Sequence, residues 1–317
     1  MTPDPVPNPT TAEGEWISAR PSRGLDVLAR LVTLPRLLRQ YRDLVTTTLK
    51  RDLAARFQGT LLGWAWPFLQ PMFLFGVYYF IFTKIIPQRM PDLPDDQQAG
   101  VGVYMFVGMI AWSALGESLA RGTGVIVDNG NLIKKLAFPS ELLPLNVVLS
   151  AMTMMLFALA VFVLATLVTP IWPAPGWHLL WLPLIVLLHG LFCYGLVLGL
   201  STLQVFLRDT IQLVSMGTTM WMFLTPVFWV PEAMNSEVAS HMGQIGLNPV
   251  YHLVRACRGA LMGDVIIPGN EYIAGGAAVS VASIPHHLLV FGAWAVGAYA
   301  LGYGFFVLAQ RRFADEV

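Results

Sequence analysis

Long apolar stretches alternate with short polar segments along most of the chain, and this alternation predicts the fold. Each apolar stretch is about 20 to 28 residues long and carries few or no charges. A bilayer core about 30 Å thick is crossed by about 20 helical residues. The pattern therefore predicts six transmembrane helices, at about 61–82, 100–119, 142–168, 179–206, 211–230 and 288–308.

Composition supports the same conclusion. Hydrophobic residues make up 56% of the 317 residues and charged residues 12%, whereas soluble proteins are about 25% charged. The mean hydropathy is +0.61. The sequence therefore predicts an all-α integral membrane protein with a six-span domain over residues 59–310.

The region before the first span divides into two parts. Residues 1–24 are rich in proline and contain no basic segment followed by an apolar core, so we expect a disordered cytoplasmic tail. In residues 25–58, apolar positions recur near the helical period with arginines between them, which predicts amphipathic interface helices. Such helices lie along the inner leaflet; packing on a partner subunit is the alternative.

A second region of interest lies between the fifth and sixth spans, at residues 231–285. Positions 250–261 form an apolar face at helical spacing, with Arg255 and Arg258 expected on the opposite face. The segment is too short to span a bilayer, so we expect a re-entrant or interfacial segment. Residues 264–284 are rich in glycine and alanine and resemble an external loop.

The distribution of basic residues predicts the orientation. With the N-terminus inside, cytoplasmic segments carry fourteen Lys and Arg residues and external segments carry four. Because cytoplasmic loops are enriched in Lys and Arg, both termini are expected in the cytoplasm, with a cytoplasmic C-terminus at 311–317.

Motifs for covalent chemistry are missing from the sequence. There is no G-x-x-x-x-G-K-[ST] phosphate loop, no G-x-S-x-G, no H-E-x-x-H and no paired Cys/His spacing. We therefore expect neither catalytic nor metal-binding residues. Cys193 and Cys257 are expected to be small buried side chains. His189, in the fourth span, is either functional or a neutral histidine hydrogen-bonded by a neighbouring helix.

Two further features allow alternative interpretations. Glu117 and Arg121 are four residues apart on one helix face, and they either pair inside the bundle or reach the lipid headgroups. Aromatic residues gather at the outer ends of the first and fifth spans, where they form either an interfacial belt or a surface that stacks on sugars. The candidates for such a lining are Tyr78, Tyr79, Phe82, Trp112, Trp221, Phe223, Phe228 and Trp229.

Four segments in register resemble the permease subunit of polysaccharide-exporting ABC transporters of the second exporter type, the family that exports O-antigen, capsule and teichoic acid. They are LKRDLAARFQGTLLGWAWPFLQPMFLFGVYYFIF, NLIKKLAFPSELLPL, RDTIQLVSMGTTMWMFLTPVFWVPEAM and LNPVYHLVRACRGALMG. The resemblance covers roughly residues 40–263. The tail before Leu25 and the segment 264–284 depart from the usual pattern.

The resemblance implies roles for particular residues. The helix 46–57 would contact an ATPase subunit. Residues 131–139, in which Asn131 can cap a short helix 132–137 that stops before Pro139, would be the coupling helix seated in that subunit. The residues implied in ATPase coupling are Lys50, Arg51, Asp52, Arg56, Asn131, Lys134, Lys135, Phe138, Pro139 and Glu141. Residues 231–262 would form external gate helices, with Asn248, Pro249, Tyr251, Arg255 and Arg258 in the gate.

The resemblance also implies partners and cargo. Such permeases form a homodimer with two copies of a separate ATPase that binds ATP and magnesium, so this chain itself would need no cofactor. The cargo would be a polysaccharide, linked to undecaprenyl diphosphate, that crosses the bacterial inner membrane; no nucleic-acid partner is expected. The alternatives are an ABC exporter permease for a drug or lipid and, in another class, a membrane-embedded glycosyl- or acyltransferase.

Overall fold

The computed structural model describes residues 39–85, 100–135, 139–169, 175–229, 242–262, 271–274, 277–280 and 284–316. The expected tail 1–24, residues 25–38 of the expected amphipathic segment 25–58, and Phe138 of the expected coupling helix lie outside these ranges.

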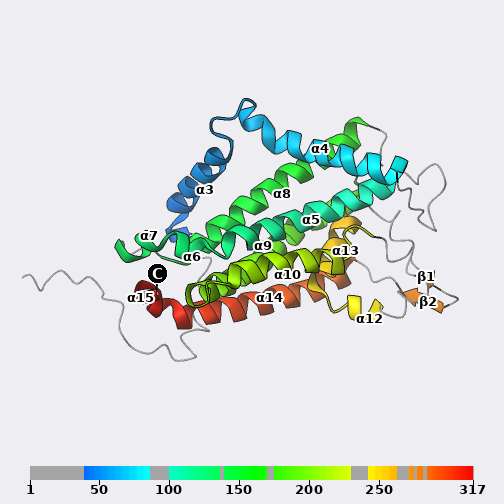
Figure 1. The fold of residues 1–317 in the computed structure, drawn as a ribbon. Helices are drawn as coiled ribbons and strands as arrows, with labels where there is room; N and C mark the ends of the chain where they lie inside the picture. The colour runs from blue at the N-terminus through cyan, green and yellow to red at the C-terminus, as the bar shows by residue number, and fades with distance from the viewer. Residues whose placement is uncertain are drawn as a thin grey trace, which may run out of the picture.

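Nearly all of the described chain is helical (Figure 1). The larger helices are α3 (Arg42–Phe57), α4 (Trp66–Phe80), α5 (Gly100–Gly122), α8 (Leu142–Val168), α9 (Leu182–Phe206), α10 (Thr210–Leu224), α13 (Pro249–Met262) and α14 (Ile284–Ala309). The short elements are η2 (Gly63–Ala65), η3 (Ile81–Ile85), α6 (Val125–Asp128), α7 (Gly130–Lys135), η5 (Trp177–Trp181), α12 (Met242–Ile245), η8 (Gln310–Arg312) and α15 (Phe313–Glu316). One antiparallel hairpin pairs β1 (Glu271–Ala274) with β2 (Ala277–Ser280), inside the segment expected to be an external loop.

Four helices of the described chain are long and apolar enough to cross a membrane: α5, α8, α9 and α14. They coincide with four of the six expected spans. The other two expected spans correspond to α4 and α10, which have 15 residues each. α4 is extended by η2 before it and by a π turn, η3, after it, and α10 ends where Thr225 and Pro226 break the helix.

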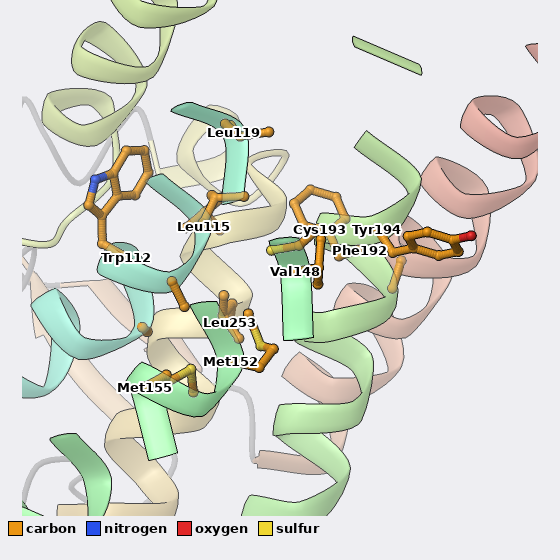
Figure 2. Packing of buried hydrophobic residues seen from close by; sticks show 14 of the residues in the cluster. Trp112, Leu115, Leu119, Val148, Met152, Met155, Phe192, Cys193, Tyr194 and Leu253 are labelled. Atoms are coloured by element: carbon orange, nitrogen blue, oxygen red, sulfur yellow. The ribbon is translucent and has the colours of Figure 1, made fainter. Parts of the chain in front are cut away.

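The core is built around α5, which contacts α4, α8, α9, α10 and α13. Figure 2 shows side chains of α5, α8 and α9 packed together, among them Leu115, Met152 and Phe192, with Leu253 of α13 beside them. Every residue of α13 from Val250 to Met262 is buried. The expectation that Arg255 and Arg258 lie on a polar outer face is therefore wrong, since these side chains are only 4% and 1% exposed.

The closest helix pair is α9 with α14, and glycine makes it possible. A Cβ atom added at Gly195 would lie 2.5 Å from the Cα atom of Tyr299, and one at Gly302 would lie 2.8 Å from the carbonyl carbon of Gly195. Small residues allow the backbones of two membrane helices to come into direct contact. One turn from Gly195, a Cβ atom added at Gly199 would lie 3.6 Å from the Cα atom of Gly302, an ordinary contact distance.

The elements divide between the two ends of the bundle. α3, α6, α7 and α15 lie at one end, whereas α12, α13 and the β1–β2 hairpin lie at the other (Figure 1).

Candidate functional site

Four charged side chains and one serine join α3 to the bundle. Asp52 and Arg56 come from α3, Glu117 and Arg121 from the last turns of α5, and Ser150 from α8. We call these five residues the charge ring. Arg121 Nη2 donates to Oδ1 of Asp52 at 2.7 Å, and Ser150 Oγ donates to Oδ2 of the same carboxylate at 2.6 Å.

Glu117 completes the charge ring by accepting from both Arg56 and Arg121. Arg56 donates from Nη2 to a Glu117 carboxylate oxygen and to Ser150 Oγ, the latter at 2.9 Å. Arg121 reaches the same Glu117 oxygen at 3.3 Å. Glu117 and Arg121 therefore do pair with each other, and both also bind α3. Two acids and two bases leave the ring without net charge.

Asp52 stays ionised in this setting. Burial alone would raise the pKa of Asp52, but the hydrogen bonds from Arg121 and Ser150 and the charges of Arg121 and Arg56 outweigh it, so the pKa of this carboxyl lies below its usual value. The ring consequently holds α3 against both α5 and α8 at neutral pH.

Two cavities lie on either side of the charge ring. The first, of about 750 Å³, lies between α3, the end of α5, α6–α7 and the start of α8, and Arg51, Asp52 and Arg121 line it. The second, of about 320 Å³, lies between α4, α5 and α8, and only Arg56 and Glu117 among its lining residues are charged. The charge ring therefore lies between two mainly apolar cavities and contributes charged side chains to each.

The expected coupling segment folds as a short helix, α7, directly after α6. Asn131 was expected to cap this helix, but the helix begins at Gly130. Asn129 precedes it instead: its backbone carbonyl accepts from the amide of Leu132 at 3.0 Å, and its side chain donates to the Val125 carbonyl at 2.8 Å. Sequence reasoning chose the wrong asparagine because both Asn129 and Asn131 suit a helix start.

Residues expected to contact the ATPase differ in exposure. Lys50, Arg51, Asn131 and Lys134 have exposed side chains, Pro139 is half-buried, and Lys135 is the last residue of α7. Glu141 is only 8% exposed. It precedes α8, and its side chain faces Gln310 rather than the outer surface.

The aromatic residues expected to line a channel fall into two groups. Tyr78 stacks on Phe82 and contacts Phe228, with ring centroids 6.4 and 5.8 Å apart. Trp112 packs edge-on against Trp221 at 6.2 Å and is only 4% exposed, so it belongs to the core of the chain. Of the remaining aromatic candidates, Phe223 is exposed, and Tyr79 and Trp229 are half-buried.

Arg258 connects α13 to two other helices. Its guanidinium donates to the backbone carbonyls of Tyr104, Pro226 and Val227 at 3.1, 2.8 and 3.0 Å, and it lies 3.3 Å from the centroid of the Tyr104 ring. The last two carbonyls follow the break that ends α10. These contacts explain how the arginine can be buried, because three backbone carbonyls accept from its guanidinium and the face of the Tyr104 ring lies against it.

Asn248 makes a second connection between the same elements. Its Oδ1 accepts from Trp221 Nε1 at 2.9 Å, and its Nδ2 donates to Thr225 Oγ1 at 2.8 Å. We call Asn248 and Arg258 together the α10–α13 clamp. Of the other expected gate residues, Pro249 is half-buried, and Tyr251 and Arg255 are buried.

Candidate metal ligands are not clustered in the described part of the chain. No cluster of three His, Cys, Asp or Glu side chains within it is placed to hold a metal ion. Cys193 and Cys257 are buried free thiols. Both ring nitrogens of His189 are buried without a hydrogen-bond partner among the described residues, so the interpretation that a neighbouring helix satisfies them does not hold there.

Comparison with known proteins assigns the fold to a family. A sequence model of the ABC-2 type transporter matches residues 43–262, well over half of the chain. The chain belongs to the ABC-2 type transporter family. The match begins in α3 and ends with α13, so this ABC-2 permease carries the charge ring and the α10–α13 clamp inside the family region and α14 and α15 beyond it.

Curated relatives of this ABC-2 permease carry more specific names. The O-antigen export system permease protein RfbA of Myxococcus xanthus is 31% identical over 251 residues, which is 79% of this chain and 92% of the relative. A protein of the same name from Klebsiella pneumoniae is 27% identical over 233 residues, which is 73% of this chain and 84% of the relative.

Proposed function

We propose that this ABC-2 permease forms the membrane channel of a polysaccharide exporter of the O-antigen type. The observation that carries the proposal is the alignment of nearly the whole Myxococcus xanthus relative, named as an O-antigen export permease, with this chain. The resemblance to permeases that move capsule and teichoic acid points to the same class of cargo.

The bilayer would contain six spans in this proposal. α5, α8, α9 and α14 are four of them, and the runs η2–α4–η3 and α10 with its following turn are the other two. Lys50 and Arg51 of α3 and Lys134 of α7 are exposed, which supports placing the end that holds these helices, and with it both termini, in the cytoplasm of a bacterium. The protein would then lie in the inner membrane.

ATP hydrolysis would occur on a separate subunit. The exposed Lys134 of α7 and the exposed basic residues of α3 form the surface that we assign to that partner. The charge ring then gives a physical route inward, because it bonds α3 directly to α5 and α8. Two permeases and two ATPase subunits would form the transporter, with ATP and magnesium held by the ATPase.

The cargo would pass between the two permeases. Phe223 and the half-buried Tyr78 and Trp221 offer ring faces that can stack on sugars without a tight binding site. A lipid carrier such as undecaprenyl diphosphate fits this class of export. α12 and α13 would close the outer end, with α13 held to α10 by the clamp.

Two alternatives make different predictions. A permease for a drug or lipid would share fold and coupling but leave glycan display unchanged when deleted. A membrane-embedded transferase would need no ATPase partner.

The test begins with purification of the tagged permease from native membranes in mild detergent and identification of the proteins that accompany it. We expect a phosphate-loop ATPase in about equal amount. Lys134→Glu should then reduce glycan at the cell surface while the permease still inserts. The matched control is Lys84→Glu, which reverses an exposed lysine of η3 at the opposite end and should leave export intact. Absence of an ATPase, or equal effects of both substitutions, would contradict the proposal.

A further inference from the structure

The last described residues of the chain contact α7 and the residues just before α8. After α14, the chain continues through η8 into α15, and α15 contacts α7 and α9 (Figure 1). Phe313, the first residue of α15, is 1% exposed and packs edge-on against Phe306 of α14 at 5.3 Å. A side chain buried to this degree anchors the terminal turn to the bundle.

A polar contact adds to this anchor. Gln310 Nε2 donates to Ser140 Oγ at 2.9 Å and lies 3.4 Å from a carboxylate oxygen of Glu141. α9 adds a further contact, in which the Tyr194 hydroxyl donates to the backbone carbonyl of Glu141 at 3.2 Å. Ser140 and Glu141 are 3% and 8% exposed. The two residues before α8 are therefore hydrogen-bonded to both η8 and α9.

The position of these contacts suggests their purpose. Ser140 and Glu141 stand between α7, whose Lys134 faces outward, and the 27-residue helix α8, which carries Ser150 of the charge ring. A push on α7 displaces α8 only if the connection between them is held firmly. Without such support, α7 could turn locally while the spans stayed in place. The terminal residues lie outside the region that the family model matches, 43–262, so the family match does not assign them a role.

We propose that Gln310 and Phe313 are positioning residues that brace the coupling segment, so that motion imposed on α7 by the ATPase reaches α8 and α9. This inference rests on the proposed function. It predicts that loss of the brace separates ATP hydrolysis from transport, a consequence that a merely stabilising role would not have.

The test compares three variants in the complete transporter with its ATPase, reconstituted in proteoliposomes. Phe313→Ala removes the buried ring, Phe313→Leu keeps most of its apolar volume, and Glu316→Ala removes an exposed side chain from the same helix as the matched control. ATP hydrolysis and glycan transport are measured on the same preparation, and hydrogen exchange is followed at residues 130–135 and 139–145.

We expect Phe313→Ala to retain the ATPase and most of its hydrolysis while the glycan moved per ATP falls about tenfold. Hydrogen exchange of α7 and the start of α8 should rise in parallel. Phe313→Leu should restore most of the ratio, and Glu316→Ala should match the wild type. Gln310→Ala should lower the ratio in the same direction by a smaller factor.

Several results would overturn the inference. One is an unchanged ratio of transport to hydrolysis in Phe313→Ala; another is unchanged hydrogen exchange at α7 and α8. Equal losses of hydrolysis and transport would assign Phe313 to assembly instead. If the wild-type permease bound no ATPase at all, the proposed function would fail and this inference with it. If the wild type and Phe313→Ala both moved the same amount of glycan per ATP hydrolysed, only this inference would be overturned.

Discussion

Replacement of Gly195 by alanine tests whether backbone contact between α9 and α14 holds the bundle together. The added Cβ atom would meet the Ala298 carbonyl carbon and the Tyr299 Cα atom, each at 2.5 Å. Non-bonded carbon atoms prefer about 3.5–4.0 Å. Because the obstructing atoms belong to the backbone of α14, no side-chain rotation relieves the clash, and the two helices must separate by about 1 Å.

The magnitude follows from two opposing effects. Overpacking of this kind costs about 1–3 kcal/mol, occasionally more, while alanine in place of glycine favours the helix by about 1 kcal/mol. Gly199→Ala is the matched control, since its Cβ atom would lie 3.6 Å from Gly302, an ordinary contact, and it receives the same helix-propensity gain. The difference between the two variants isolates the clash at about 1–3 kcal/mol.

The assay is thermal unfolding of the purified permease in mild detergent, followed by tryptophan fluorescence. At roughly 2–4 °C per kcal/mol for chains of about this size, Gly195→Ala should melt several degrees below Gly199→Ala. Gly302→Ala should resemble Gly195→Ala. Equal midpoints for the variants at 195 and 199 would refute the view that glycine contact sets the separation of α9 and α14.

Three further predictions concern the charge ring and the clamp. Asp52→Ala and Arg121→Ala should be non-additive, with a coupling of about 1 kcal/mol for this partly exposed pair; additive unfolding midpoints would show that they do not stabilise each other. Because the pKa of Asp52 is lowered from 3.8 by its partners, the stability it contributes is complete above about pH 4 and is lost as pH falls through the folded pKa, so hydrogen exchange of α3 should rise only in acid, and Asp52→Asn should abolish that dependence. Arg258→Met removes three donors and should cost about 3 kcal/mol, at about 1 kcal/mol per hydrogen bond, with little recovery in Arg258→Lys; the control Arg208→Met, at an exposed residue, should leave the unfolding midpoint unchanged.

The membrane helices could be predicted from the sequence because their apolar stretches are long. The expected span 142–168 coincides with α8, and those at 100–119, 179–206 and 288–308 differ from α5, α9 and α14 by a few residues at their ends. The first and fifth expected spans are longer than the single α-helices found there, since α4 and α10 have 15 residues each. Their apolar runs continue through a π turn or past a proline, and hydropathy does not register such interruptions.

The contacts between distant segments could not be predicted. Glu117 and Arg121 were found because four residues is a helical spacing, but Ser150 lies 98 residues from Asp52 and has no local signature. Arg258 was assigned to an outer face because periodicity treats arginine as solvated. Its burial depends on carbonyls of Tyr104 and Pro226, and the first is 154 positions away in the chain.

The glycine face of α9 also bears on how the protein is made. α14 is synthesised about a hundred residues after α9, yet it packs against Gly195 more closely than a side chain would allow. Until α14 has been synthesised, the face of α9 that carries Gly195 cannot be covered by α14 and contacts lipid or an insertion factor instead. A ribosome that stops before Ile284 leaves this face uncovered, together with His189, whose ring packs near Phe291 of α14 in the finished molecule. An unfinished copy thus differs from the complete one by an uncovered helix surface that carries Gly195 and His189.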